Sequence, residues 1–315
     1  MKLFNCLGVL ILLATATSQG ARLGDPAPPI LVNEMIKGAP VDLAAGKGKQ
    51  IFIVEFWATW CPPCRETIPH LTKLQKKFRD KGVTIIGISD ESAEDVKPFV
   101  RKMGRAMEYA VAVDPDHRTY ATYMDAYARE NIPTAFLVDK EGRVVWVGFP
   151  LEGMDEALDK IIAGTYDLAA VQKEVADQEA RQQRLMQLNL TFGKYLQFAD
   201  KDDKENAAAE FVKLLEIAGA DAEMLSNIAW TLLTSSSIKH RDFPLALRLA
   251  TLGMKASDGK NLSVLDTYAR ALFESGQVDE AIQQQKKAIS LTSDRKIKSA
   301  LESSLKAYKA KRPKT

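Results

Sequence analysis

The strongest constraint on the fold is a change of hydrophobic pattern near Gly164. Before it, five apolar runs of strand length alternate with segments of helical periodicity, and no such run follows it. The apolar runs cover residues 50–56, 83–89, 109–113, 134–139 and 144–148, and the helical segments cover residues 63–81, 93–103, 118–129 and 154–162. Continuous apolar runs are typical of strands buried on both faces, so the pattern predicts βαβ units and a mainly parallel sheet.

The segment Asp139–Val145, with the sequence DKEGRVV, joins the last two of these runs. A short polar segment with a glycine between two apolar runs is typical of a tight β-hairpin. We therefore expect an α/β fold, with a mixed central sheet flanked by helices, followed by an all-α region.

The region after Gly164 is rich in Ala, Leu, Gln and Lys and has helical periodicity. A long amphipathic helix is expected over Asp167–Leu188, and another over Ala207–Gly219. Two helix pairs that follow resemble each other, namely Glu223–Leu233 with Asp242–Ala256, and Ser263–Phe273 with Val278–Leu291.

Small residues recur at matching places in these two pairs. Ala246 and Ala281 are 35 residues apart, and Ala229 and Ala269 are 40 residues apart, a difference that the loop Thr234–Arg241 accounts for. This spacing resembles the tetratricopeptide repeat (TPR), whose period is about 34 residues. A plain helical bundle is the alternative, and the number of repeats stays open.

The N-terminus has the pattern of an export signal. Lys2 precedes the apolar run Leu7–Ala16, whose last residues are small enough for cleavage. This run is shorter than the roughly 20 residues that span a bilayer. We expect a signal peptide over 1–20, an α/β domain over 21–164 and a TPR-like domain over 165–315. The protein would then be periplasmic or secreted, and an uncleaved membrane anchor is the alternative.

The overall charge gives no indication of a nucleic-acid partner, and none is expected. The 315 residues carry a net charge of +2, with 46% hydrophobic and 27% charged residues, as in ordinary soluble proteins. The tail after Asp294 is basic, and we interpret it as a solvated final helix rather than a nucleic-acid or membrane-binding segment.

The use of cysteine favours a redox pair. Cys6 lies in the predicted signal peptide, so the exported chain would keep only Cys61 and Cys64. Two cysteines this close in sequence cannot cross-link a fold, and a zinc site needs about four ligands. The three histidines are scattered along the chain, at His70, His117 and His240. We therefore expect a redox-active disulfide, with no metal and no other cofactor.

The two cysteines differ in their expected positions. Cys61 follows a strand, and Cys64 lies in the first turn of the next helix, where Pro62 and Pro63 are well tolerated. The N–H groups and the dipole of a helix N-terminus favour a thiolate at Cys61, which makes it the attacking sulfur. Cys64 would then resolve the mixed disulfide. Trp60, directly before Cys61, could cover the disulfide and offer a flat docking surface.

An acid interrupts the apolar run before the cysteines. Glu55 stands six residues before Cys61, and strand alternation points it away from the face of Val54 and Phe56. A carboxyl group buried there would have a raised pKa and could carry the proton that Cys64 loses before it attacks. The alternative is an acid, exposed at an edge or linked to water, that has no catalytic part.

Two motifs resemble the thioredoxin superfamily: EFWATWCPPC, which begins at Glu55, and NIPTAFLVDKEGRVV, which begins at Asn131. The greatest similarity is to exported thiol–disulfide oxidoreductases of the TlpA/ResA type, with a redoxin or AhpC/TSA-like domain, over about residues 24–164. The resemblance implies a thioredoxin-like fold for this part of the chain. The segment between Ser89 and Asp114 resembles the helix and strand that are inserted in this branch.

The same resemblance implies a substrate-binding segment beside the disulfide. The peptide between Ile132 and Pro133 would be cis, an uncommon form that is usually a placed feature. The main chain around Ile132, Pro133 and Thr134 would pair with an extended substrate strand, next to Trp60.

The chain departs from this family near the buried acid. Thioredoxin has an aspartate at the place of Glu55, where many exported relatives have a neutral residue. Those relatives often have a glutamate three residues after the second cysteine, where this chain has Thr67. Glu66 is one residue early, which turns its side chain by about 100° on the helix. The segment Thr84–Ser89 offers no lysine as a partner, so proton handling is assigned to Glu55.

These features favour a thiol–disulfide oxidoreductase that reduces protein disulfides outside the cytoplasm. Its partners would be disulfide-containing protein substrates and an upstream thiol reductant, membrane-bound or soluble, that restores the dithiol. The TPR-like region is expected to offer a site for a further protein partner.

Three alternatives remain open. Disulfide oxidases and isomerases share the fold and differ in reduction potential. The chain could also be an interaction protein, in which the helical repeats bind partner proteins and the redox domain is accessory. Peroxide reduction, as in peroxiredoxins, is disfavoured, because Thr59 stands two residues before Cys61 instead of three, and no proline stands four residues before that threonine.

Overall fold

The computed structural model describes residues 20–238 and 241–311, so the predicted signal peptide lies almost entirely outside the described residues. The chain divides into two compact units, one ending at Glu174 and the other beginning at Val175, inside helix α6 (Leu168–Asp200). In the described part of the chain, every helix is either too short or too polar to cross a bilayer.

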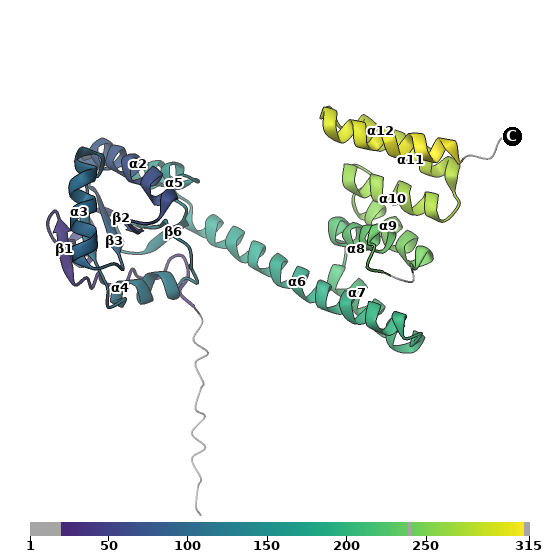
Figure 1. Ribbon diagram of the computed structural model, residues 1–315, viewed down its shortest axis with the longest axis horizontal. Helices are drawn as coiled ribbons and strands as arrows, with labels where there is room; N and C mark the ends of the chain where they lie inside the picture. Colours follow the sequence, from purple (N-terminus) through teal and green to yellow (C-terminus); the bar gives the residue numbers. More distant parts are fainter. Residues whose placement is uncertain (1–19, 239–240, 312–315) are drawn as a thin grey trace, which may run out of the picture. The chain divides into compact units, whose positions relative to one another are not determined.

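The first unit contains a six-stranded sheet (Figure 1). Its strands are β1 (Glu34–Lys37), β2 (Ile51–Phe56), β3 (Val83–Ser89), β4 (Ala110–Val113), β5 (Thr134–Val138) and β6 (Val144–Gly148), in the order β1-β4-β3-β2-β5-β6. Strand β3 pairs in parallel with β2 and with β4, whereas the β1–β4, β2–β5 and β5–β6 pairs are antiparallel. The mixed sheet of the predicted fold class is confirmed, but the expectation of a mainly parallel sheet is wrong.

Helices cover both faces of this sheet (Figure 1). They are α1 (Leu43–Gly46), α2 (Pro62–Phe78), α3 (Ala93–Met103), α4 (Arg118–Tyr120) and α5 (Met154–Ala163). Helices α2, α3 and α5 share one core with Ile51 and Ile53 of β2. The other core joins Phe52, Val54 and Phe56 to α1 and to the segment after α4. Because side chains alternate along a strand, Glu55 lies on the α2 face, in phase with Ile51 and Ile53.

The helix expected over residues 118–129 is shorter and wider than predicted. After α4 the chain continues as a π-helical turn, Ala121–Asp125, and Ala128 has a left-handed backbone with φ 50°. The wide turn packs Tyr123 against Phe136 with ring centroids 5.1 Å apart. Aromatic packing against the sheet therefore sets the geometry here, in place of a regular helical repeat.

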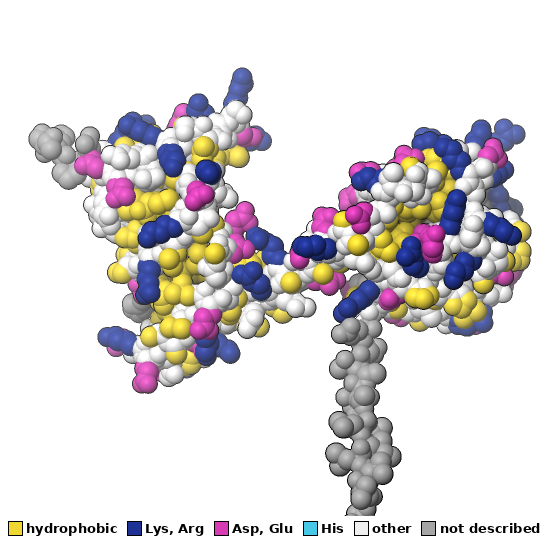
Figure 2. All heavy atoms as spheres, turned by 180° about the vertical axis from the view of Figure 1, so that it is seen from behind, with side chains coloured by type: hydrophobic (Ala, Val, Ile, Leu, Met, Phe, Trp, Pro, Cys, Tyr) yellow, Lys and Arg dark blue, Asp and Glu magenta, His cyan; other side chains and the backbone are white. Residues whose placement is uncertain are grey.

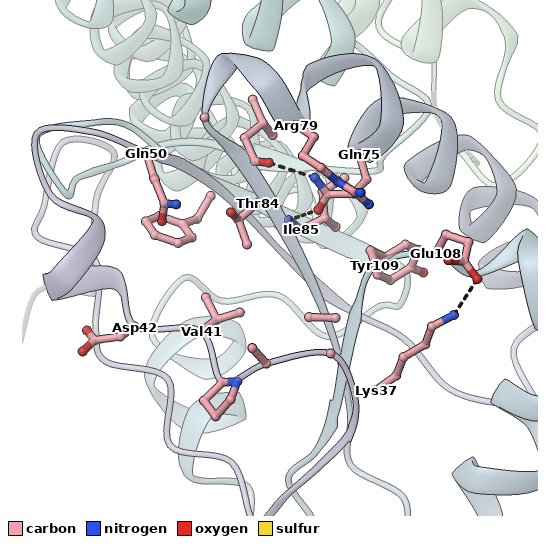
Figure 3. A pocket seen from close by; sticks show the side chains of 17 residues that line it. Lys37, Val41, Asp42, Gln50, Gln75, Arg79, Thr84, Ile85, Glu108 and Tyr109 are labelled. Atoms are coloured by element: carbon pink, nitrogen blue, oxygen red, sulfur yellow. Dashed lines mark hydrogen bonds and ion pairs between the residues drawn. The ribbon is translucent and has the colours of Figure 1, made fainter.

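A glutamine completes the hydrogen bonding of β3 where its neighbour is missing. Strand β4 begins opposite Ile86, so the first residues of β3 have no strand on that side. The side-chain amide of Gln75 donates to the Val83 carbonyl at 2.8 Å and accepts from the Ile85 N–H at 2.7 Å (Figure 3). A buried amide that mimics a peptide in this way leaves neither main-chain group unpaired.

A cavity of about 500 Å³ lies beside this glutamine. Charged and polar side chains around it include an ion pair between Lys37 and Glu108, at 2.8 Å (Figure 3). Its wall contains Gln50 and Gly82, which precede β2 and β3, whereas Cys61 follows the other end of β2. The cavity therefore lies at the end of the sheet opposite the cysteines.

The second unit is entirely helical in its described residues, which confirms the all-α region. After α6 come α7 (Lys204–Ala218), α8 (Ala222–Thr234), α9 (Phe243–Ala256), α10 (Leu262–Glu274), α11 (Val278–Ser290) and α12 (Arg295–Ala310). The predicted helices agree with these to within a few residues, except that α6 continues past Leu188 to Asp200. The four matched alanines, Ala229, Ala246, Ala269 and Ala281, are all fully buried, as expected of residues that let paired helices approach closely.

Candidate redox site

Cys61 and Cys64 are joined in a disulfide at the start of α2, with the sulfurs 2.01 Å apart. Cys61 is the N-cap residue, and Pro62 and Pro63 occupy the first helical positions, as the sequence predicts. The main-chain N–H of Cys64 donates to the Sγ of Cys61 at 3.2 Å. The sulfur of Cys61 thus takes the place of a capping oxygen, where a helix N-terminus favours negative charge.

Access to the disulfide is limited to one side. Cys64 is fully buried, and Cys61 keeps only 2% of its surface exposed. Trp60 is 66% exposed, whereas Trp57 is buried in the core. Cys61 is therefore the more accessible of the two cysteines, and its sequence neighbour Trp60 is exposed.

The segment before β5 lies beside this sulfur. The Ile132–Pro133 peptide is cis, which confirms the expectation drawn from the family resemblance. The carbonyl oxygen of Ile132 lies 3.8 Å from the Sγ of Cys61, and the hydroxyl of Thr134 donates to the Asn131 carbonyl at 2.6 Å. A cleft of about 350 Å³ runs along this segment and includes Pro63 from α2. The structure thus brings Ile132, Pro133 and Thr134 together with Cys61.

Glu55 is fully buried in β2, between its register partners Gly87 of β3 and Ala135 of β5. It is not at a sheet edge. Burial raises the pKa of Glu55 to about 8, although hydrogen bonds from Thr67 and Tyr109 act in the opposite direction. A carboxyl with this pKa exchanges its proton close to neutral pH.

Two hydroxyl groups hold this carboxyl. The Thr67 hydroxyl lies 3.0 Å from one oxygen of Glu55, and the Tyr109 hydroxyl lies 3.3 Å from the other. Glu66 is exposed on the outer side of α2, as its helical position predicts. Sequence reasoning did not find the Thr67 contact, although its place three residues after Cys64 puts it on the same helix face. The sequence did not indicate that Tyr109 contacts Glu55, because the two residues are 54 positions apart.

The loop before Cys61 is fixed from two sides, which the sequence did not reveal. The N–H and the hydroxyl of Thr59 both donate to the carboxylate of Glu91, each at 2.6 Å. Ser89 donates to the same carboxylate at 2.9 Å. The guanidinium of Arg65 donates to the Thr59 carbonyl at 2.8 Å. Every polar group of Thr59 therefore has a partner, and the residues between β2 and α2 are held in one conformation.

Known proteins share this domain. The AhpC/TSA family matches residues 23–147. The thiol-disulfide oxidoreductase ResA of Bacillus thuringiensis (strain Al Hakam) is 36% identical over 131 residues, which cover 41% of this chain and 71% of the relative. The chain belongs to the ResA family of thiol–disulfide oxidoreductases. ResA of Bacillus subtilis (strain 168) is 35% identical over 120 residues, 38% of this chain and 63% of that protein.

Two further similar proteins have lower sequence identity to this chain. Protein FixW of Rhizobium leguminosarum is 29% identical over 160 residues, covering 48% of this chain and 71% of FixW. A crystal structure of a thiol:disulfide interchange protein of the thioredoxin family, from Chlorobium tepidum TLS, is 31% identical with a TM-score of 0.36. It covers 47% of this chain and 100% of that chain.

Thiol–disulfide exchange moves two electrons between a dithiol and a disulfide, and the disulfide of this domain is Cys61–Cys64. The range of the AhpC/TSA family match, residues 23–147, lies within the first unit and leaves the helical unit outside it. Among the described residues, His, Cys, Asp and Glu side chains nowhere gather in a group of three or more that could hold a metal ion.

Proposed function

We propose that this ResA-family protein reduces disulfides in other proteins, outside the cytoplasm, by dithiol–disulfide exchange at Cys61 and Cys64. The observation that carries the proposal is the position of the Cys61 sulfur. It caps α2, accepts a hydrogen bond from the Cys64 N–H and lies 3.8 Å from the carbonyl oxygen of Ile132, and the preceding residue, Trp60, is exposed. The reducing direction rests on the resemblance to thioredoxin at Ile132, directly before the cis proline.

In the first step, the thiolate of Cys61 attacks one sulfur of the substrate disulfide. A bond forms between that sulfur and Cys61, and the other substrate sulfur leaves with the electron pair as a thiolate. The N-terminus of α2 supports this step, because its N–H groups and dipole favour the thiolate form of Cys61 over the thiol.

In the second step, Cys64 gives up its proton and attacks the sulfur of Cys61. The intramolecular disulfide forms, and the remaining substrate sulfur leaves as a thiolate that takes a proton from water. Glu55 is the acceptor of the Cys64 proton in this proposal. Its pKa of about 8 is close to the ordinary pKa of a thiol, about 8.5, so the proton can pass in either direction at low cost.

The substrate would bind in the cleft beside the disulfide. An extended segment could pair with the main chain around Ile132, Pro133 and Thr134, and its side chains could lie against the indole of Trp60. The cleft of about 350 Å³ and the high exposure of Trp60 support this assignment. Aromatic rings that are exposed beside a reactive group are typical contact points for partner proteins.

The partners and location are proposed from the sequence together with the family. An N-terminal signal over residues 1–20 would export the chain to the periplasm or the medium, with a membrane anchor as the alternative. A thiol reductant, membrane-bound or soluble, would then restore the dithiol. No nucleic acid takes part in this proposal.

The TPR-like domain, proposed over 165–315 after an α/β domain over 21–164, would bind a protein partner. A groove of about 630 Å³ in the helical unit supports this, with Tyr195, Phe211 and Leu245 among the residues that line it and Arg248 over the ring of Phe211. Figure 2 shows hydrophobic side chains gathered between lysine and arginine side chains on one face of this unit. Its exposed large apolar residues include Met186, Leu190, Val212, Trp230 and Leu252.

The alternative function is oxidation or isomerisation of disulfides by the same cysteine pair. The reduction potential separates the two: a reductant of this fold lies near the roughly −270 mV of thioredoxin, and a strong oxidant near about −120 mV. We expect a value on the thioredoxin side, measured by equilibration with glutathione or dithiothreitol.

A matched pair of cysteine variants tests the proposal in an insulin-reduction assay driven by dithiothreitol. Cys61→Ser should reduce turnover to the rate of dithiothreitol alone, because the attacking sulfur is gone. Cys64→Ser should instead accumulate a mixed disulfide between Cys61 and its substrate, because the first step proceeds and the second cannot. Unchanged turnover in Cys61→Ser would overturn the proposal and leave the helical repeats as the functional part.

A further inference from the structure

A single hydroxyl joins the buried acid to the helix that carries the cysteines. The Oγ1 of Thr67 lies 3.0 Å from Oε1 of Glu55 and 2.9 Å from the main-chain carbonyl oxygen of Cys64. All three groups are buried, and Thr67 itself has no exposed surface. The side chain of Thr67 is therefore a bridge between β2 and the first turn of α2.

The Thr67 hydroxyl has one proton to donate and two neighbouring acceptors, the Glu55 carboxyl and the Cys64 carbonyl. A carbonyl oxygen can only accept, so when the Thr67 hydroxyl donates to Cys64, its contact with Glu55 requires that the carboxyl group donates in turn. When Glu55 is ionised, it can only accept, and the hydroxyl of Thr67 must point towards it. The direction of the Thr67 hydroxyl thus follows the protonation state of Glu55.

The other surroundings of Glu55 are neutral. Its register partners Gly87 and Ala135 carry no polar side chain, and Tyr109 is held protonated because burial, followed by the nearby Glu55, raises its pKa far above the usual value. Among the described residues, no charged side chain shifts the pKa of Glu55. With Tyr109 at the longer distance of 3.3 Å, Thr67 makes the shorter of the two contacts to this carboxyl.

We infer that Thr67 is a positioning residue for proton transfer: its hydroxyl holds Glu55 against the first turn of α2 and stabilises the ionised carboxylate at the moment when Cys64 must lose its proton. This inference rests on the proposed function, in which Glu55 accepts that proton. It adds a residue that the family pattern does not supply, since the chain has a threonine where related enzymes often have an acid.

The proton balance of the step is simple. The Cys64 thiol loses a proton and Glu55 gains it, while the new sulfur–sulfur bond forms and the bond from Cys61 to the substrate breaks. Before the transfer, Thr67 donates to the carboxylate; after it, the protonated carboxyl can donate to Thr67, and the Thr67 hydroxyl can return to the Cys64 carbonyl. Without this hydroxyl, Tyr109 would be the one side-chain donor left to the ionised Glu55 among the described residues.

The test compares Thr67→Val, which removes the hydroxyl at nearly constant shape, with Thr67→Ser, which keeps it. Thr72→Val is the matched control, because Thr72 lies on the same helix and its hydroxyl donates to Ala106 at 2.7 Å instead of to Glu55. The reduced proteins are mixed with an excess of a small aromatic disulfide, and the rate of the second, intramolecular step is measured from about pH 6 to about pH 10.

Thr67→Val should slow this step about tenfold at neutral pH, the effect of losing one hydrogen bond to a charged group. Its pH profile should move to higher pH, and its rate should approach the wild-type rate in alkaline solution. Thr67→Ser and Thr72→Val should keep the wild-type profile. A uniform loss of rate with an unmoved profile would show a merely structural role and overturn the inference, as would a wild-type profile in Thr67→Val.

Glu55→Gln, measured in the same way, separates this inference from the proposed function. If Glu55→Gln loses the pH-dependent rise and Thr67→Val does not shift it, Glu55 is the proton acceptor and only the role of Thr67 is wrong. If Glu55→Gln keeps the wild-type profile, the proposed role of Glu55 fails, and the inference fails with it.

Discussion

Glu55 is a carboxyl group that folding removes completely from water, and this ties the stability of the protein to pH. In the unfolded chain its pKa is near 4.5, whereas burial raises it to about 8 in the folded state. Below pH 4.5 Glu55 is protonated in both the folded and the unfolded state, so it does not lower the free energy of unfolding. As pH rises from 4.5 to 8, only the unfolded state releases the proton, and folding loses about 5 kcal/mol from this group alone.

Replacing this acid by its neutral isostere should remove that loss. We expect Glu55→Gln to be more stable than wild type near pH 8 by several kcal/mol, and about equal to it near pH 4.5, because the amide never ionises. Urea unfolding of both proteins across this pH range measures the difference. Glu66→Gln is the control, since Glu66 is exposed on α2. Stability curves of wild type and Glu55→Gln that stay parallel would contradict a raised pKa.

The position of Cys61 depends on elements that meet at the loop between β2 and α2. Glu91, from the loop after β3, accepts both polar hydrogens of Thr59, while Arg65 of α2 donates to the Thr59 carbonyl. Hydrogen bonds to charged groups are the stronger ones, and two of these are only 2.6 Å long. These contacts thus link the β2–α2 loop both to the segment after β3 and to α2, two residues before the reactive Cys61.

Loosening this loop should slow the reaction more than it lowers the stability. We expect Glu91→Ala to slow the attack of Cys61 about tenfold, since a displacement of about 1 Å at a reacting group can cost far more than that. The rate of alkylation of the reduced protein by iodoacetamide measures this attack. Glu94→Ala is the control, because Glu94 is an exposed acid at the start of the neighbouring helix α3. Equal rates in the two variants would show that the Glu91 contacts do not position Cys61.

At this scale the sequence predicts elements better than their pairing. Strand β3 matches its predicted bounds, because burial on both faces leaves a continuous apolar run. Strand β6 also matches its predicted bounds, although it lies at the sheet edge and only Val144 and Val145 are buried. The short strand β1 is only partly buried and leaves no such run, so neither it nor its antiparallel pairing was found. The cysteines and the cis proline were found through local motifs. The contact of Tyr109 with Glu55 joins residues 54 positions apart, which no local pattern can reveal.

The whole molecule contains two separate sets of buried residues. The two cores of the α/β unit are formed by buried residues from Leu43 to Leu158, and those of the helical unit by buried residues from Leu188 to Tyr308. Between these sets, the first half of α6 contributes no buried residue: in this helix they are Leu188, Thr191 and Tyr195. Because cooperativity comes from shared buried surface, each unit should unfold as its own cooperative block.

Calorimetry of the full chain should therefore resolve two transitions that respond to different substitutions. Near pH 8, Glu55→Gln should raise only the melting temperature of the α/β unit, because it removes the cost of ionising a buried acid there. Ala246→Leu should lower only that of the helical unit, because a larger side chain at a fully buried alanine costs about 1–3 kcal/mol in overpacking. A single transition that both substitutions move would show instead that the two cores fold as one, and that α6 transmits stability between them.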